Sequence, residues 1–296
     1  MGRLDGKVGI IMGGASPNMG GTVAHLMAQE GAKIFVNDIE PGVVGSTIDF
    51  LQSRGFEASG AAGDAGNEQQ VASVVNQAVA EFGTIDLLYN DAGWHYWSPV
   101  LETELEQWND QFRRNMTAAM LTTKYVGRVM VDHGRGGSIV HTASDAGHQG
   151  EAGSSGYSGV KAGIINFSRG AAMDLAAQGI RVNTVSPTFN EHLLLRPQVR
   201  GTERTEGPYA RSPDDFLKGI PLGRFCSVLD IANAVVFLLS DDASFITGHD
   251  MKLDGGALVR YWPWQPGEFT GVSTEDFLSD WHPIKYGERS EDVFRP

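Results

Sequence analysis

Cysteine is almost absent from this sequence. Cys226 is the single cysteine among 296 residues, so no disulfide can form within one chain. A chain without disulfides is typical of a reducing compartment, and we therefore expect a cytoplasmic protein. A lone cysteine can be a nucleophile, but it is more often a small core residue.

Long apolar runs and an excess of positive charge are absent too. No stretch approaches the roughly 18 apolar residues of a membrane span, and residues 1–6 form no apolar signal region. Lys and Arg number 23 against 36 Asp and Glu, which gives a net charge of −13. Nucleic acids and anionic membranes require a basic footprint. We therefore expect neither a nucleic-acid nor a membrane partner.

Short apolar runs alternate with amphipathic segments along most of the chain. Strands are expected at 7–12, 32–37, 56–62, 85–89, 137–142, 180–185 and 251–253. Helices are expected at 22–28, 43–54, 69–82, 101–131, 157–177 and 229–239. This alternation is typical of βαβ units and predicts an α/β fold with a single doubly wound parallel sheet, Rossmann-like, with helices on both faces. We find no internal linker or repeat, so residues 1–256 are predicted to form one domain.

A glycine-rich turn, Gly13 to Gly21, separates the first predicted strand from the first predicted helix. Tight backbone there and the following helix N-terminus suit the pyrophosphate of a dinucleotide. The pattern Gly-x-Gly-x-x-Gly is not met, and Asn18 is a candidate for a glycine position because Asn tolerates positive φ. Candidate contacts in this turn are Gly13, Ser16, Asn18 and Met19.

Asp38 ends the second predicted strand, and Ile39 follows it. A carboxylate at this point accepts hydrogen bonds from the adenosine ribose and repels a 2′-phosphate. No arginine follows, so we expect NAD rather than NADP. The alternative is that Asp38 is only a loop acid or a helix cap.

Tyr157 and Lys161 are four residues apart, which places both on one face of a helix. An ammonium beside a phenol favours the phenolate and should lower the pKa of Tyr157 from about 10. Such a pair can transfer a proton near neutral pH. Taken alone, the pair is more often an ordinary surface of a helix.

Other motifs occur along the chain, before and after this pair, in an order that is known from one protein family. Residues 5–256 resemble the short-chain dehydrogenase/reductase family, whose Tyr-x-x-x-Lys matches Tyr157 and Lys161. The family's serine, thirteen residues before the tyrosine, matches Ser144, and its helix asparagine matches Asn115. The remaining matches are Asn90-Asp91-Ala92-Gly93, Asp64, the segment 220–224 and the closing segment 246–256.

The resemblance implies roles for these residues. Tyr157 would be the general acid/base, and Ser144 would orient the substrate oxygen. Lys161 would lower the pKa of Tyr157 and bind the nicotinamide ribose, and Asn115 would hold a water of a proton relay. Hydride would pass from the carbinol carbon to the nicotinamide. Further cofactor contacts implied by the family are Asp64, Ala65, Asn90, Ala92, Gly93, Pro187, Thr188 and Asn190. A homotetramer is expected on the same ground, and no metal site is expected.

The sequence departs from the family pattern at several positions. The phosphate turn begins with Met12-Gly13 and has one extra residue near Pro17, and Asp91 replaces an asparagine. The threonine that holds the nicotinamide amide has no clear counterpart, with Asn190 or His192 as candidate substitutes. A lengthened turn resembles the family's enoyl reductases, but those space Tyr and Lys seven apart, where this chain has Ile164. We therefore reject that branch.

The substrate side has three candidate segments. Ring-bearing residues, Trp94, His95, Tyr96 and Trp97, follow the fourth predicted strand and suggest a pocket for a bulky ring, or else core packing or an oligomer contact. His148 is a further candidate for the cleft. By resemblance, residues 188–219 are a substrate lid. Residues 257–296 form an aromatic C-terminal extension that we expect to cover the cleft.

These observations predict an NAD-dependent oxidoreductase that interconverts a secondary alcohol and a ketone. Its small-molecule alcohol or ketone substrate is expected to be cyclic or aromatic. A first alternative is an NADPH-dependent reductase of small carbonyls or acyl thioesters. A second is a non-catalytic nucleotide-sensing protein of this fold, although such proteins typically lose the Tyr or the Lys.

Overall fold

A parallel sheet forms the centre of the protein. The structure, a computed structural model, describes residues 2–13, 19–190 and 213–259. Within these residues the sheet has seven strands in the order β3-β2-β1-β4-β5-β6-β7. The strands are β1 (Val8–Met12), β2 (Lys33–Asp38), β3 (Ala58–Ala62), β4 (Leu87–Asn90), β5 (Gly137–Thr142), β6 (Ile180–Pro187) and β7 (Asp250–Leu253). The predicted doubly wound parallel sheet is therefore confirmed.

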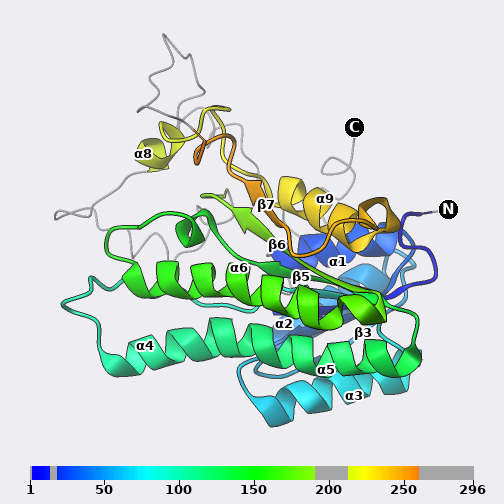
Figure 1. The fold of residues 1–296 in the computed structure, drawn as a ribbon. Coiled ribbons are helices and arrows are strands. Elements are labelled where there is room, and N and C mark those ends of the chain that lie inside the picture. Colours follow the sequence, from blue (N-terminus) through cyan, green and yellow to red (C-terminus); the bar gives the residue numbers. More distant parts are fainter. Residues whose placement is uncertain (1, 14–18, 191–212, 260–296) are drawn as a thin grey trace.

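The helices connect the strands and cover both faces of the sheet. They are α1 (Met19–Gln29), α2 (Pro41–Gln52), α3 (Glu68–Phe82), α4 (Leu105–Phe112), α5 (Ala118–His133), α6 (Ser155–Leu175), α8 (Pro213–Leu217) and α9 (Val228–Leu239). Figure 1 shows α3, α5 and α6 on one side of the sheet and α1 and α9 on the other. No helix in the described parts of the chain is both long and apolar enough to cross a membrane.

Alternate residues of the strands point into two separate cores. Ile11 and Ile34 pack with α1, α2 and α9, whereas Ile10, Met12 and Phe35 pack with α3, α5 and α6. This alternation follows from the two-residue period of a strand. Because both faces of the sheet are covered, every residue of the central strands β1 and β4 is buried.

Local sequence signals determine several helix ends. The Asn67 side chain accepts a hydrogen bond from Gln70 N at the start of α3, and Gly83 ends that helix with φ 79°. Ser227 and Asp230 form a reciprocal capping box at the start of α9. Such caps satisfy backbone groups that lack a partner within the helix.

The predicted long helix over residues 101–131 is divided in the structure. A π-helical turn, Arg113–Thr117, separates α4 from α5 and contains Asn115. Single π-helical turns inside a helix are frequent at functional sites.

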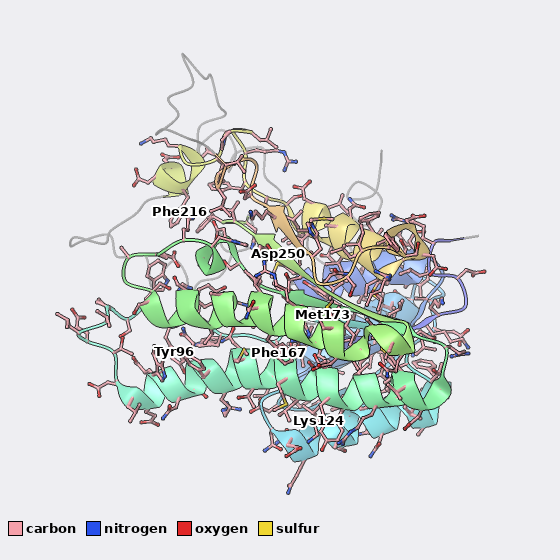
Figure 2. All side chains as sticks on the ribbon, viewed as in Figure 1. Tyr96, Lys124, Phe167, Met173, Phe216 and Asp250 are labelled. Atoms are coloured by element: carbon pink, nitrogen blue, oxygen red, sulfur yellow. The ribbon has the colours of Figure 1, made fainter. Side chains whose placement is uncertain are left out.

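Parts of the predicted lid and extension lie outside the described residues, namely 191–212 and 260–296. The described ends of the predicted lid meet at an aromatic contact, because Phe189 stacks on Phe216 of α8 with ring centroids 4.5 Å apart. Phe216 is labelled in Figure 2. The boundaries of the lid and of the extension stay predictions.

Candidate active site

The candidate residues gather at the carboxyl edge of the sheet. Because all seven strands are parallel, the segments that follow β1, β2, β3, β4, β5 and β6 begin at the same edge. The strand order reverses between β1 and β4, and open α/β sheets bind ligands at such a point. Candidate residues on these segments are Gly13, Asp38, Asp64, Asn90, Ala92, Gly93, Ser144, Pro187, Thr188 and Asn190.

The phosphate turn begins with a glycine that no other residue can replace without strain. Gly13 has φ +78°, and a Cβ on it would lie 2.6 Å from Cα of Ala92. The turn after β1 therefore packs directly against the turn after β4. Ser16 and Asn18 lie outside the described residues. Met19 begins α1, and its Sδ accepts a hydrogen bond from Asn190 at 3.9 Å.

Tyr157 and Lys161 lie on the first turns of α6, on one face, as their spacing predicts. Lys161 is 4% exposed, and its Nζ donates to the Thr142 carbonyl at 2.8 Å. The same Nζ lies 5.5 Å from the centroid of the Tyr157 ring. The carbonyl at the end of β5 thus anchors the ammonium beside the phenol.

The expected lowering of the Tyr157 pKa is wrong, because the pKa is raised instead. Burial of the phenol raises its pKa well above 10, and the nearby charge of Glu151 adds to this, whereas a hydrogen bond with Ser144 opposes it. Burial also lowers the pKa of Lys161 to about 8, although the Asp91 carboxylate favours the charged form. Desolvation therefore outweighs the attraction between the two groups that their spacing suggested.

Ser144 follows β5 and is held by its neighbours. Its Oγ donates to Asp145 Oδ1 at 3.1 Å and accepts from Ala146 N at 3.2 Å. Thr188 Oγ1 donates to the other oxygen of Asp145 at 2.7 Å. Burial raises the pKa of Asp145, and Asp254 adds to the effect. Asp145 thus links the end of β5 to the end of β6.

Asn115 is fully buried in the π-helical turn. Its Nδ2 donates to the carbonyls of Trp94 and Gln111, each at 2.8 Å. Its Oδ1 has no hydrogen-bond partner among the described residues. A Cβ on Gly93 would lie 2.7 Å from this oxygen and 3.6 Å from Lys161 Nζ, so Gly93 lets both polar groups approach one stretch of backbone.

Several buried polar atoms at this edge suit a nucleotide cofactor. Amide oxygens of Asn90, Asn115 and Asn190 lack partners among the described residues. An unpaired buried acceptor costs about 1–3 kcal/mol, so a ligand donor or an ordered water is expected there. Asp38 Oδ1 accepts from Glu40 N at 3.1 Å, and its other oxygen makes no hydrogen bond within the described chain. These features fit a bound dinucleotide with its ribose at Asp38.

A scan against family models matches residues 14–257 to a model described as enoyl-(acyl carrier protein) reductase. Relatives of known name cover the same part of the chain. This chain is 35% identical over 258 residues to (-)-isopiperitenol/(-)-carveol dehydrogenase of Mentha piperita, covering 86% of this chain and 94% of the relative. It is 32% identical over 254 residues to 3-oxoacyl-[acyl-carrier-protein] reductase FabG of Vibrio cholerae, covering 86% and 98%. The chain belongs to the short-chain dehydrogenase/reductase family.

Solved structures of this family superpose on the fold. NAD+-bound xylitol dehydrogenase matches with a TM-score of 0.80 and 31% identity, covering 86% of this chain and 99% of the other. A gluconate 5-dehydrogenase from Burkholderia cenocepacia, in complex with NADP and tartrate, matches with a TM-score of 0.79 and 26% identity, covering 87% and 97%. The protein is thus an oxidoreductase of this family, with both cofactors found among its structural neighbours.

Asp64, a candidate cofactor-binding residue, forms an ion pair with Arg113. The Asp64 carboxylate accepts from Gly66 N at 2.8 Å and from Arg113 Nη1 at 2.5 Å. Ala65 beside it is 7% exposed. Asp64 can still accept a further hydrogen bond through its remaining lone pairs. The ion pair with Arg113 is not evident from the sequence, because 49 residues separate the partners.

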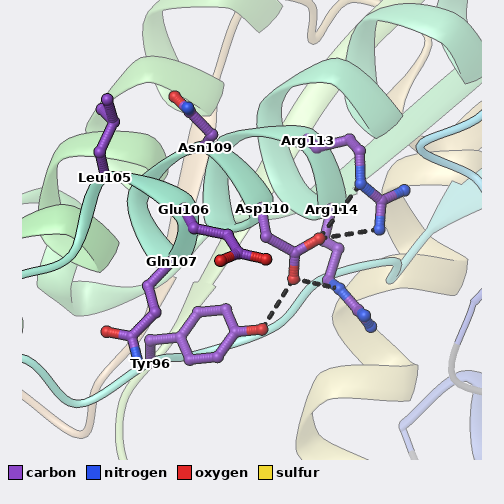
Figure 3. Close-up of a pocket in the computed structure, with 8 residues that line it drawn as sticks. All are labelled: Tyr96, Leu105, Glu106, Gln107, Asn109, Asp110, Arg113 and Arg114. Atoms are coloured by element: carbon purple, nitrogen blue, oxygen red, sulfur yellow. Dashed lines mark hydrogen bonds and ion pairs between the residues drawn. The ribbon is translucent and has the colours of Figure 1, made fainter.

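The aromatic loop after β4 sends its side chains in different directions. His95 stacks on Tyr157, whereas the Tyr96 hydroxyl donates to Asp110 at 2.7 Å. Figure 3 shows Asp110 bound by Tyr96, Arg113 and Arg114 at once. These three residues and Asp110 line an open pocket of about 870 Å³ beside α4. Trp94 is 39% exposed beneath the Arg114 guanidinium. Of the three predicted substrate residues in this loop, the structure brings His95 into contact with Tyr157.

His148, the remaining substrate candidate, is bound to the last strand. Its Nε2 lies 2.7 Å from Asp250 Oδ2, and Asp250 Oδ1 also accepts from Ser186 at 2.7 Å. This contact joins the turn after β5 to β6 and β7. Asp145, by contrast, contacts Ser144 directly. It is not among the site residues predicted from the sequence, although its position next to Ser144 could have indicated it.

Proposed function

We propose that this family member is an NAD-dependent oxidoreductase that interconverts a secondary alcohol and a ketone on a cyclic or aromatic substrate. The observation that carries the proposal is the contact of the buried Lys161 ammonium with the Thr142 carbonyl, 5.5 Å from the Tyr157 ring, with Ser144 hydrogen-bonded to that tyrosine. A buried ammonium, a phenol and a hydroxyl that meet at the ligand-binding edge are suited to proton transfer at a carbinol oxygen.

The residues around Asp38 support NAD as the cofactor. Asp38 keeps one carboxylate oxygen without a hydrogen bond to the described chain, and it would accept from both ribose hydroxyls but repel a 2′-phosphate. Ile39 is 50% exposed and offers an apolar surface at the place for adenine. Gly13, Met19, Asn90, Ala92, Gly93 and the segment 187–190 would line the rest of the dinucleotide site. Bound NAD+ would supply the hydride acceptor and a positive charge.

The protein's own groups would act as follows. Tyr157 would accept the proton of the substrate hydroxyl, and the Lys161 ammonium would stabilise the phenolate that burial otherwise disfavours. Ser144 would turn its hydroxyl from Asp145 to the substrate oxygen and stabilise charge there. Lys161 has two donors left beyond its bond to Thr142, and these would reach the nicotinamide ribose. Asn115 Oδ1 would hold the water that leads a proton away.

The pocket would be closed by segments of the chain that the sequence analysis singled out. We infer that His95 and Trp94 form one wall, that residues 188–219 act as a lid, and that residues 257–296 contribute to the cleft. We further infer a homotetramer. The apolar residues Trp108 and Met120, which are exposed on α4 and α5, support a contact between copies of the chain.

A cofactor-reduction screen tests the proposal. The purified protein is incubated with NAD+ and with NADP+ against steroid, terpene and aryl secondary alcohols, and the absorbance of the reduced nicotinamide is recorded. We expect reduction of NAD+ with at least one cyclic alcohol and a lower kcat/KM with NADP+. Activity with NADP+ alone would refute the cofactor assignment.

Two additional assays, NADPH oxidation by a thioester and cofactor binding, separate the proposed function from two others. The relationship to the FabG reductase favours, as a second candidate, an NADPH-dependent reductase of small carbonyls or acyl thioesters. Oxidation of NADPH by a 3-oxoacyl thioester, without alcohol-dependent reduction of NAD+, would support that candidate. A non-catalytic nucleotide sensor would bind the cofactor without any turnover, and the presence of both Tyr157 and Lys161 argues against it.

A further inference from the structure

The imidazole of His95 lies flat on the ring of Tyr157. The ring centroids are 4.1 Å apart, and the planes differ by 22°. The same imidazole contacts Trp97, with centroids 4.8 Å apart. His95 is therefore packed between the aromatic loop and the tyrosine at the candidate active site.

Hydrogen bonds hold His95 in this position. Its Nε2 lies 2.6 Å from Oγ of Ser154, which is fully buried. The backbone adds a second link, because Ser98 N donates to the Gly153 carbonyl at 2.8 Å. These contacts connect the loop after β4 to the segment that precedes Tyr157. They hold the His95 imidazole against the Tyr157 ring.

The imidazole is neutral and keeps one nitrogen available. Burial and the charge of Lys161 lower the pKa of His95 to about 4, so the ring is uncharged at neutral pH. A neutral imidazole carries one donor and one acceptor nitrogen. Ser154 uses Nε2, and Nδ1 makes no hydrogen bond with any residue that the structure describes.

Ser154 has a second partner that influences which nitrogen carries the proton. A hydrogen bond from Ser154 lowers the pKa of Glu151, but burial raises it further, to about 7. If Ser154 donates to the ionised Glu151 carboxylate, its Oγ accepts from His95 Nε2–H, because a hydroxyl has a single proton to donate. His95 Nδ1 then carries a lone pair and accepts a hydrogen bond from a hydroxyl.

We propose that His95 is a specificity-determining residue whose Nδ1 binds a second hydroxyl of the substrate, on the carbon next to the one on which Tyr157 acts. The substrate class is then a cyclic vicinal diol in the oxidation direction and an α-hydroxy ketone in the reduction direction. The two rings are stacked with centroids 4.1 Å apart, and two hydroxyls on adjacent carbons, joined by two C–O bonds and one C–C bond, are suited to bind one group on each ring. This inference rests on the proposed alcohol dehydrogenase function and narrows its substrate.

Binding and turnover of two simple probes test the inference separately. The probes are cyclohexanol and cis-cyclohexane-1,2-diol, offered to the full-length protein with NAD+ at pH 8, where Glu151 is ionised. Dissociation constants are measured by calorimetry, and kcat/KM is measured from NAD+ reduction. We expect the diol to bind about tenfold more tightly than cyclohexanol, as one buried hydrogen bond allows.

Variants assign this preference to the imidazole. His95→Phe keeps a ring on Tyr157 but has no nitrogen, so the two probes should bind about equally. His95→Gln restores a hydrogen-bonding group and should recover part of the preference. His133→Phe makes the same exchange at an exposed position at the end of α5 and should leave the preference unchanged. Circular dichroism checks that each variant is folded.

The outcomes distinguish this inference from the proposed function. If wild type binds the diol no better than cyclohexanol, or does not bind it, or if His95→Phe keeps the preference, the inference is overturned. If both alcohols reduce NAD+ equally well, the proposed function stands and the inference fails. If the His95-dependent binding preference is found but NAD+ is never reduced, the inference stands and the proposed function fails.

Discussion

Replacing Lys161 by Met should stabilise the protein near neutral pH. The side chain is 4% exposed and charged, and its Nζ is hydrogen-bonded to the Thr142 carbonyl. Burial lowers the pKa of Lys161 from 10.5 to about 8. The folded protein therefore solvates the Lys161 ammonium less well than water does. Such a loss of stability is common at functional sites.

The size of the effect follows from the two pKa values. The gap between them corresponds to about 3 kcal/mol at about 1.4 kcal/mol per pH unit. Loss of the hydrogen bond to Thr142 costs about 1 kcal/mol. We therefore expect Lys161→Met to raise the free energy of unfolding by about 2 kcal/mol at pH 7.

In wild type, the contribution of Lys161 to the free energy of unfolding depends on pH between its two pKa values. Between pH 8 and pH 10.5 the unfolded chain binds more protons than the folded one, because the folded pKa of Lys161 is the lower. The stability contributed by this group therefore rises with pH across that window. The advantage of the Met variant should shrink there, and above the window the lost hydrogen bond should make the variant slightly less stable.

The assay is urea unfolding followed by circular dichroism, without cofactor, at fixed protein concentration and at several pH values from 7 to 10. Lys124→Met is the control, since Lys124 is half-exposed on α5 beside Glu68 (Figure 2), and an exposed ion pair contributes little. A Met variant at position 161 that is less stable than wild type at pH 7 would refute the reasoning. So would parallel pH profiles of that variant and wild type.

Three further outcomes are expected. Tyr157→Phe should lower kcat by about a hundredfold to ten-thousandfold, the usual contribution of a general acid/base, with an unchanged dissociation constant for NAD+ by fluorescence titration; unchanged turnover would contradict the assignment. Asp38→Ala combined with Ile39→Arg should reverse the preference from NAD+ to NADP+ in kcat/KM, and a preference for NAD+ that persists would show that other residues select the cofactor. A chain ended after Ala257 should change its substrate preference or its assembly size by gel filtration, and no change in either would exclude a role of the C-terminal extension at the cleft.

Much of the fold could be predicted because it depends on local patterns. The two-residue and 3.6-residue periods of apolar residues indicate strands and helices, and their alternation allows one economical sheet topology. The division at Asn115 was not predicted, because no apolar period in the sequence marks a single wider turn inside a helix. The helical spacing predicted that Tyr157 and Lys161 lie together, and the resemblance to the family added Ser144.

The order of strands and helices along the chain was enough to predict which strand ends meet at one edge of the sheet, because parallel strands bring their carboxyl ends together whatever the details of packing. Gly13 lies in the turn at one such end, and Lys161 was placed beside Tyr157 by the helical spacing. The tertiary structure alone decided how these groups behave. Burial raises the pKa of Tyr157 where the sequence predicted a fall, and it keeps His95 neutral. Desolvation and stacking depend on side chains far apart in the chain, such as His95 and Ser154, so no local pattern reports them.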